Sequence, residues 1–265
     1  MTVDLLAALA GTLGYGVASV LQAVGAARAS GPAVMRHPAY LAGLACDGLA
    51  WLASLVALQH LPLFVVQSLL AGSLGVTVLL AWVFLGARLR TRDIVAVAVA
   101  AVALATVAGA SGAQSAQGAP HGFRLAMLAL ALVTAAVTAL LYGRGGSLSL
   151  ATLAGVAFSG AALCARAATA DWGRLLTEPL AWAVLGFGAV GALTYARSLE
   201  RGPVGPATAV LWVVEVLVPG IIGIAVLGDL VRPGWTLPTV LAVAAAVVAC
   251  SMLATSPAQQ AADAS

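Results

Sequence analysis

The chain has 265 residues, of which 62% are hydrophobic and only 8% carry a charge. Water cannot solvate so much apolar surface, so this composition excludes a soluble globular protein and indicates a multi-pass membrane protein. The formal net charge of +3 comes from arginines between apolar runs, which bears on membrane orientation and gives no case for nucleic acid as a partner. The chain contains no Lys and no Asn, a composition that indicates a GC-rich bacterial genome and hence a bacterial cytoplasmic membrane.

Nine apolar runs are long enough to cross a membrane, which takes about 20 residues of helix. We therefore predict an all-α fold with one transmembrane domain over residues 1–265. Its spans are expected at 5–27, 39–60, 63–85, 93–110, 123–142, 149–168, 180–200, 204–227 and 236–254. Segments rich in Gly, Pro, Ser or Arg separate these runs, and the one at 111–122 is predicted to be a flexible external loop.

The arginines are distributed unevenly between the two sides that these spans define. About eight of the 12 fall on one side: Arg28, Arg36, Arg88, Arg90, Arg92, Arg144, Arg197 and Arg201. Cytoplasmic loops carry an excess of positive charge, so this side is expected to be cytoplasmic. The N-terminus is then outside the cell, and the short tail at 255–265 is in the cytoplasm.

Two segments resemble each other, WLASLVALQHLPLFVVQSLLAGSLGVTVLLAWVFLGARLR and ALTYARSLERGPVGPATAVLWVVEVLVPGIIGIAVLGDLVR. At an offset of roughly 141 residues Pro62 aligns with Pro203, and the two Leu-Gly pairs align after a slip of one residue. Spans two to four thus match spans seven to nine, and this odd displacement places the copies in opposite orientations. We predict two inverted repeats (4 + 1 + 4) around a central cavity, a transporter architecture. The first repeat covers 1–110, the external loop and spacer helix 111–145, and the second repeat 146–254.

Two acidic residues lie in the middle of apolar spans. Asp47 shares one helix face with Trp51 and Ser54, and Glu215 shares one with Thr208 and Trp212. Counted at ~1.5 Å per residue from the arginine-rich side, Asp47 lies about 12 Å deep and Glu215 about 16 Å deep. A carboxylate at that depth is costly unless it faces protein or water, is paired, or is protonated. We predict that these two residues bind the substrate or a coupling ion.

Seven further polar or aromatic residues are candidates for lining the cavity: Tyr15, Gln22, Trp51, Ser54, Tyr195, Thr208 and Trp212. Pro219, one turn after Glu215, removes a backbone hydrogen bond and is a candidate hinge. For the stripes and tryptophans the alternative is helix packing, and for the proline a static kink. The alternative for the carboxylates is a structural ion pair with Arg166 or Arg197. We expect Arg197 to pair with Glu200, and Arg166 to lie near Asp171 at the end of its span.

Nothing in the sequence indicates an enzyme. We find no Ser/His/Asp spacing, P-loop or HExxH motif, so no catalytic residues and no cofactor are predicted. GFGAVG at 186–191 matches GxGxxG, but it lies within a span with no strand before it, so we interpret it as a packing motif. No metal site is predicted, except that Asp47 and Glu215 would hold the ion if the substrate were a cation.

The pattern VALQHLPLFVVQSLLAGSLGVTVLLAWVFLGARLR resembles the EamA-like repeat of the drug/metabolite transporter superfamily, and SLERGPVGPATAVLWVVEVLVPGIIGIAVLGDLV resembles it too. The two quoted segments span 56–90 and 198–231, about a quarter of the chain. Where that family often has Glu after Leu-Gly, this sequence has Ala87 and Asp229. The nine-span layout with an external N-terminus looks most like the NIPA-type magnesium transporter branch. This resemblance implies a bundle of two inverted repeats, a central substrate cavity and no bound cofactor.

The sequence therefore favours a secondary transporter of a small metabolite or drug-like solute that is coupled to protons or cations. The alternatives are a divalent-cation (magnesium) transporter, a flippase for a lipid-linked headgroup, and a membrane scaffold subunit that transports nothing. The expected partners are membrane lipid and a small-molecule or cation substrate, and a homodimer is left open.

Overall fold

The structure is a computed structural model that describes residues 2–28, 36–110, 120–168, 177–257 and 259. The described residues form ten helices and no strand. The helices are α1 (Thr2–Ala27), α2 (Pro38–His60), α3 (Leu63–Ala71), α4 (Ser73–Leu85), α5 (Thr91–Gly109), α6 (Phe123–Tyr142), α7 (Ser147–Ala167), α8 (Pro179–Glu200), α9 (Val204–Val226) and α10 (Thr236–Ala254). An all-α fold is thus confirmed. Most of the predicted external loop at 111–122, most of the tail and Asp171 lie outside the described residues.

The described part of the chain contains nine helical segments long and apolar enough to cross a membrane, in agreement with the nine predicted spans. The third, Leu63–Leu85, consists of α3 and α4. The sequence predicts one helix there, but the structure interrupts it at Gly72. A Gly-Ser pair weakens a helix at this point, and a Cβ on Gly72 would lie 2.5 Å from Leu104 Cδ1 of α5. Glycine therefore allows both the break and the close approach of α5.

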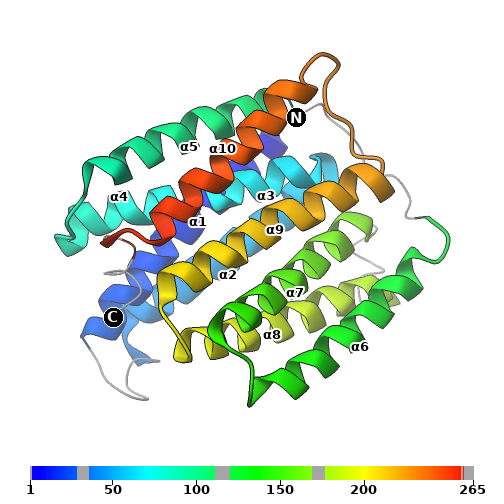
Figure 1. Cartoon of the computed structure of the whole chain (residues 1–265), viewed down its shortest axis with the longest axis horizontal. Coiled ribbons are helices and arrows are strands. Elements are labelled where there is room, and N and C mark those ends of the chain that lie inside the picture. The colour runs from blue at the N-terminus through cyan, green and yellow to red at the C-terminus, as the bar shows by residue number, and fades with distance from the viewer. Residues whose placement is uncertain (1, 29–35, 111–119, 169–176, 258, 260–265) are drawn as a thin grey trace.

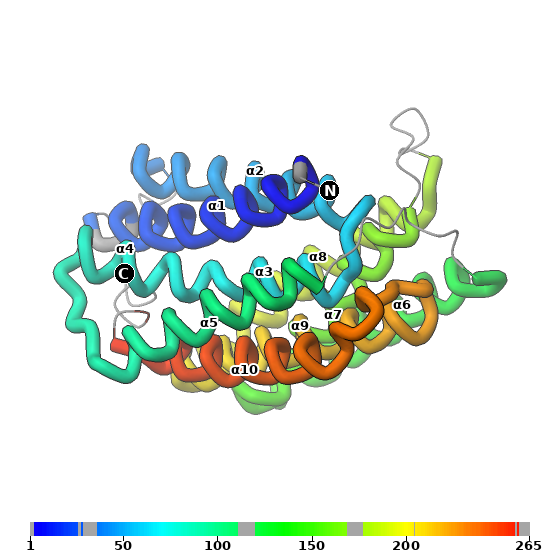
Figure 2. Tube along the Cα trace, turned by 90° about the horizontal axis from the view of Figure 1, so that it is seen from above, coloured from blue at the N-terminus to red at the C-terminus, as the bar shows by residue number. Residues whose placement is uncertain are grey.

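The helices run side by side in one bundle (Figure 1). In Figure 2 the α1–α2 pair forms one side of the bundle, and α5 and α10 lie on the other side. α1 begins and α10 ends at opposite ends of the bundle (Figure 2), as an odd number of spans requires. We call the end at which α1 begins the N-terminal end of the bundle.

Two inner helices differ from the rest in being covered by protein. All nine residues of α3 are buried, and most of α7 is buried as well. By contrast α6, the predicted spacer, lies at the edge of the bundle (Figure 1), with outward leucines such as Leu125 and Leu132. Apolar side chains exposed on outer helices are stable in lipid, so the burial pattern fits a membrane bundle with α3 and α7 at its centre.

Small residues bring neighbouring helices close together. A Cβ on Gly14 of α1 would lie 2.8 Å from the Cβ of Ala50 on α2, and one on Gly43 of α2 would lie 2.7 Å from Gln22 Cγ on α1. Inside a membrane the hydrophobic effect does not drive helices together, and small residues allow the close packing that does. They hold α1 and α2 together as one unit.

The landmarks that align the two predicted repeats have the same local structure. Pro62 is the N-cap of α3 and Pro203 the N-cap of α9, both with extended backbone. Gly86 after α4 and Gly228 after Leu227 both adopt a positive φ, of 64° and 72°, which glycine accepts without strain. The copies also differ, because α9 continues through Pro219 whereas the first copy is divided at Gly72.

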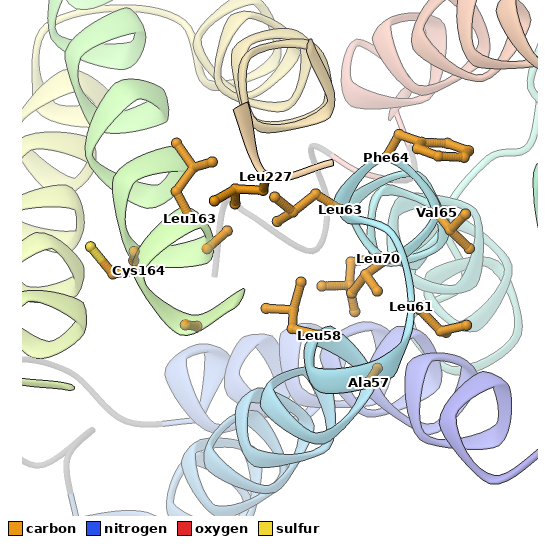
Figure 3. Packing of buried hydrophobic residues seen from close by; sticks show 14 of the residues in the cluster. Ala57, Leu58, Leu61, Leu63, Phe64, Val65, Leu70, Leu163, Cys164 and Leu227 are labelled. Carbon is orange, nitrogen blue, oxygen red and sulfur yellow. The ribbon is translucent and has the colours of Figure 1, made fainter. Parts of the chain in front are cut away.

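A cluster of buried apolar side chains closes the N-terminal end of the bundle (Figure 3). Leu58 of α2, Leu63 of α3 and Leu163 of α7 point toward one another there, together with Leu227 after α9. Each of these leucines is at most 5% exposed. This cluster joins elements from the first and second halves of the chain.

Candidate functional site

Asp47 and Glu215 stand in the middle of α2 and α9, on helices from different halves of the chain. Both side chains are half-buried. The tryptophan on each of their faces is placed differently: Trp51 is 36% exposed, whereas Trp212 packs against the buried apolar clusters. The two carboxylates thus sit at similar depth in two separate spans.

Tyr15 of α1 lies near both carboxylates and near the hydroxyl of Ser54. Ser54 is buried and donates a hydrogen bond of 2.7 Å to the backbone oxygen of Trp51. The structure therefore brings four of the predicted site residues together, and we name Tyr15, Asp47, Ser54 and Glu215 the carboxylate cluster.

Neither candidate arginine neutralises this cluster. Arg197 pairs with Glu200, as predicted, and also donates to the backbone oxygen of Tyr142. Arg166 pairs with Asp229 at 2.9 Å. Within the described part of the chain, Asp47 and Glu215 make neither an ion pair nor a hydrogen bond. A structural ion pair with these arginines, the alternative considered above, is therefore wrong.

The burial of Arg166 corrects part of a prediction, whereas its expected neighbour Asp171 lies outside the described residues. The sequence places it near the end of its span beside Asp171, like a residue that reaches toward water. In the structure its side chain is only 3% exposed, and the Asp229 side chain is fully buried. Sequence spacing gave no sign of this pair, because 63 residues separate its partners and the fold alone brings them together.

Gln67 is a candidate site residue that the sequence analysis missed. It is 3% exposed, and its Oε1 has no hydrogen-bond partner among the described residues. It lies on the face of α3 between Leu63, which meets Gly223 of α9, and Leu70, which meets Gly11 of α1. Gln67 therefore faces the two helices that carry Glu215 and Tyr15. A lone glutamine in the apolar run LFVVQSLLA was the available signal.

Pro219 is buried inside α9 and changes the backbone next to Glu215. Proline has no N–H, so the backbone oxygen of Glu215, four residues earlier, lacks its regular helical donor. One turn of α9 thus offers a carboxylate and a backbone oxygen together. Broken or unsatisfied helix turns of this kind provide ion and substrate contacts inside membranes.

The other predicted lining residues fall outside the carboxylate cluster. Tyr195 of α8 and Thr208 of α9 share a hydrogen bond of 2.6 Å between their hydroxyl groups. Gln22 lies against Gly43 at the crossing of α1 and α2. Their place in a cavity stays a prediction, as does that of Trp51 and Trp212.

The carboxylate cluster and the residues beside it offer several hydrogen-bond acceptors. Two carboxylates, the Glu215 backbone oxygen and the Gln67 amide can receive hydrogen bonds from a solute or coordinate a hard cation through water. In the described ranges, no three His, Cys, Asp or Glu side chains are grouped so as to hold a metal ion by themselves.

Comparisons of the chain with protein-family models, curated proteins and solved structures find no match. The resemblance to the drug/metabolite transporter superfamily therefore stays an expectation from the quoted motifs, and function has to be argued from the site.

Proposed function

We propose that this chain is a secondary transporter of a small polar metabolite or drug-like solute in the bacterial cytoplasmic membrane. It would work by alternating access and be coupled to protons or another cation. The observation that carries the proposal is the carboxylate cluster: two acidic side chains in mid-span, from the two halves of the chain, with no cationic partner in the described structure. Such residues are costly in a membrane and are found where ions or substrates pass.

The arrangement of helices supports this role. Asp47 belongs to the α1–α2 unit and Glu215 to α9, so a movement of one unit relative to the other changes the surroundings of both acids. Two halves of opposite orientation, as in the predicted inverted repeat, can exchange inward-open and outward-open shapes around such a site. We assign Asp47 and Glu215 the binding of the solute or coupling ion, and Tyr15, Ser54 and Gln67 its orientation.

Uptake into proteoliposomes tests the proposal. Vesicles with the purified protein are given an imposed pH gradient and a defined mixture of amines, amino acids, nucleosides and sugars, and their contents are read by mass spectrometry. We expect at least one solute to accumulate. Glu215→Gln or Asp47→Asn should lower its uptake by about tenfold or more, since tenfold corresponds to ~1.4 kcal/mol of lost binding or coupling.

Glu200→Gln is the matched control, because Glu200 is exposed and pairs with Arg197 outside the cluster. Uptake unchanged in both cluster variants would show that the two acids play no part in transport. Accumulation of Mg²⁺ alone would favour the divalent-cation transporter, and transfer of lipid headgroups between leaflets would favour the flippase. A protein that moves none of these substrates would fit the scaffold.

A further inference from the structure

The ion pair between Arg166 and Asp229 joins the two halves of the chain at the N-terminal end of the bundle. Arg166 Nη2 lies 2.9 Å from Asp229 Oδ1, and both side chains are almost completely buried. Arg166 belongs to the last turn of α7, and Asp229 follows α9.

The same two side chains also bind the backbone of the first half. Arg166 Nη1 donates to the backbone oxygens of Leu58 and Gln59, at 3.0 and 2.9 Å, in the last turn of α2. Asp229 Oδ2 accepts from the backbone N–H of Leu63, at 2.7 Å, where α3 begins. Gln59 Nε2 adds a hydrogen bond of 3.0 Å to the backbone oxygen of Ala165 on α7. These polar contacts form one network across the α2–α3 turn.

The network lies beside the cluster of buried apolar side chains in Figure 3, at the N-terminal end of the bundle. Leu58, whose backbone oxygen accepts from Arg166, also contributes its side chain to that apolar cluster. A Cβ on Gly223 would lie 2.6 Å from Asp229 Oδ2, and Glu215 stands about two turns earlier on the same helix. The network therefore contacts the end of the helix that carries Glu215.

The chemistry of the network suits a contact that opens. Apolar residues often stabilise the contact between two helices as much as a buried ion pair does, or more. Stability of the closed contact alone therefore does not explain why the pair is charged. When helices separate and water enters, however, a separated Arg and Asp become hydrated, whereas separated apolar side chains do not. A buried ion pair can therefore stabilise the closed state, and its separation into water costs less free energy than the separation of an apolar contact.

We propose that Arg166 and Asp229 form a gate that closes the N-terminal end of the bundle, which the arginine distribution assigns to the cell exterior. This inference rests on the proposed transport function. Opening separates α7 and the turn after α9 from the α2–α3 turn, and it exposes the carboxylate cluster to that side.

Labelling with a membrane-impermeant maleimide tests the gate without any substrate. Cys46, Cys164 and Cys250 are replaced by Ala, and Ser54→Cys places one thiol in the carboxylate cluster. Asp229→Asn or Arg166→Gln should raise the rate at which reagent outside the N-terminal end labels this thiol, by about tenfold or more, because breaking a buried pair leaves one charge uncompensated. Arg166→Met with Asp229→Leu, an apolar replacement, should keep the rate low.

The matched control is Glu178→Gln, which breaks the ion pair with Arg124, an arginine whose side chain is 58% exposed, at the same end of the bundle. It should leave the labelling rate unchanged. Separate single-cysteine proteins with His121→Cys or Arg28→Cys report which side of the vesicle faces the reagent. If Asp229→Asn unfolds the protein, Gln59→Leu, which removes only the contact to Ala165, should still speed labelling.

Folded Asp229→Asn, Arg166→Gln and Gln59→Leu proteins that label no faster than their parent would overturn the gate. The two proposals can fail separately. Wild-type uptake with unchanged labelling would refute the gate alone, and faster labelling in a protein that takes up nothing would refute transport while the closure stands.

Discussion

Glu215 and Arg166 illustrate two ways in which a charged side chain is accommodated inside a membrane protein. Arg166 is surrounded by an ion pair and two backbone oxygens, which compensate its loss of water. Glu215 has no such compensation among the described residues, although it lies deep in a span. An acid left without a partner needs a solute, an ion, water or a proton to be stable there.

A substitution of Gln67 can show whether this residue stabilises the fold or binds the solute. Because its Oε1 has no partner in the described structure, Gln67→Leu should leave the free energy of unfolding unchanged or raise it by about 1 kcal/mol, while uptake falls. Thr138→Val is the control, since it removes a buried hydrogen bond to Thr194 outside the carboxylate cluster and the gate, and should cost about 1 kcal/mol. Thermal unfolding in detergent and uptake are measured together. A Gln67→Leu protein that is destabilised but transports normally would show that Gln67 has a structural role only.

Among the helices, α9 carries the most information about movement. Pro219→Ala gives the backbone oxygen of Glu215 its regular donor, which should stiffen the helix. We expect the variant to be at least as stable as the parent and its uptake to be slower, because the turn next to Glu215 bends less easily. Pro206→Ala is the control, since Pro206 lies in the first turn of α9, where proline costs no helical hydrogen bond. Equal uptake in all three proteins would mean that the kink is static.

The helices could be predicted closely from the sequence, because each span is a long apolar run bounded by Gly, Pro or Arg. The break at Gly72 was not predicted, because a Gly-Ser pair weakens a helix without always interrupting it. The two mid-span acids, Asp47 and Glu215, could be recognised from the sequence because each interrupts an apolar run. The nearness of Tyr15 to both acids and the pairing of Arg166 with Asp229 depend on which helices become neighbours, and periodicity within one helix contains no such information.

Across the part of the molecule that the structure describes, two features combine: a buried apolar cluster with an ion pair at the N-terminal end, and two mid-span acids without a cationic partner. The first joins α2, α3, α7 and the turn after α9, and the second joins α1, α2 and α9. A scaffold subunit has no need for acids without partners in its interior. Glu215 is therefore expected to be an acid inside the membrane that small molecules can reach.

Reaction with dicyclohexylcarbodiimide tests whether small molecules reach Glu215. This apolar reagent forms stable adducts with protonated carboxyl groups in water-poor surroundings. The folded protein in lipid nanodiscs is treated, and peptides are analysed by mass spectrometry. We predict an adduct at Glu215, none in the Glu215→Gln protein, and none at Asp229, which Arg166 holds in an ion pair. A Glu215 that stays unmodified in the folded protein would show that small molecules do not reach it.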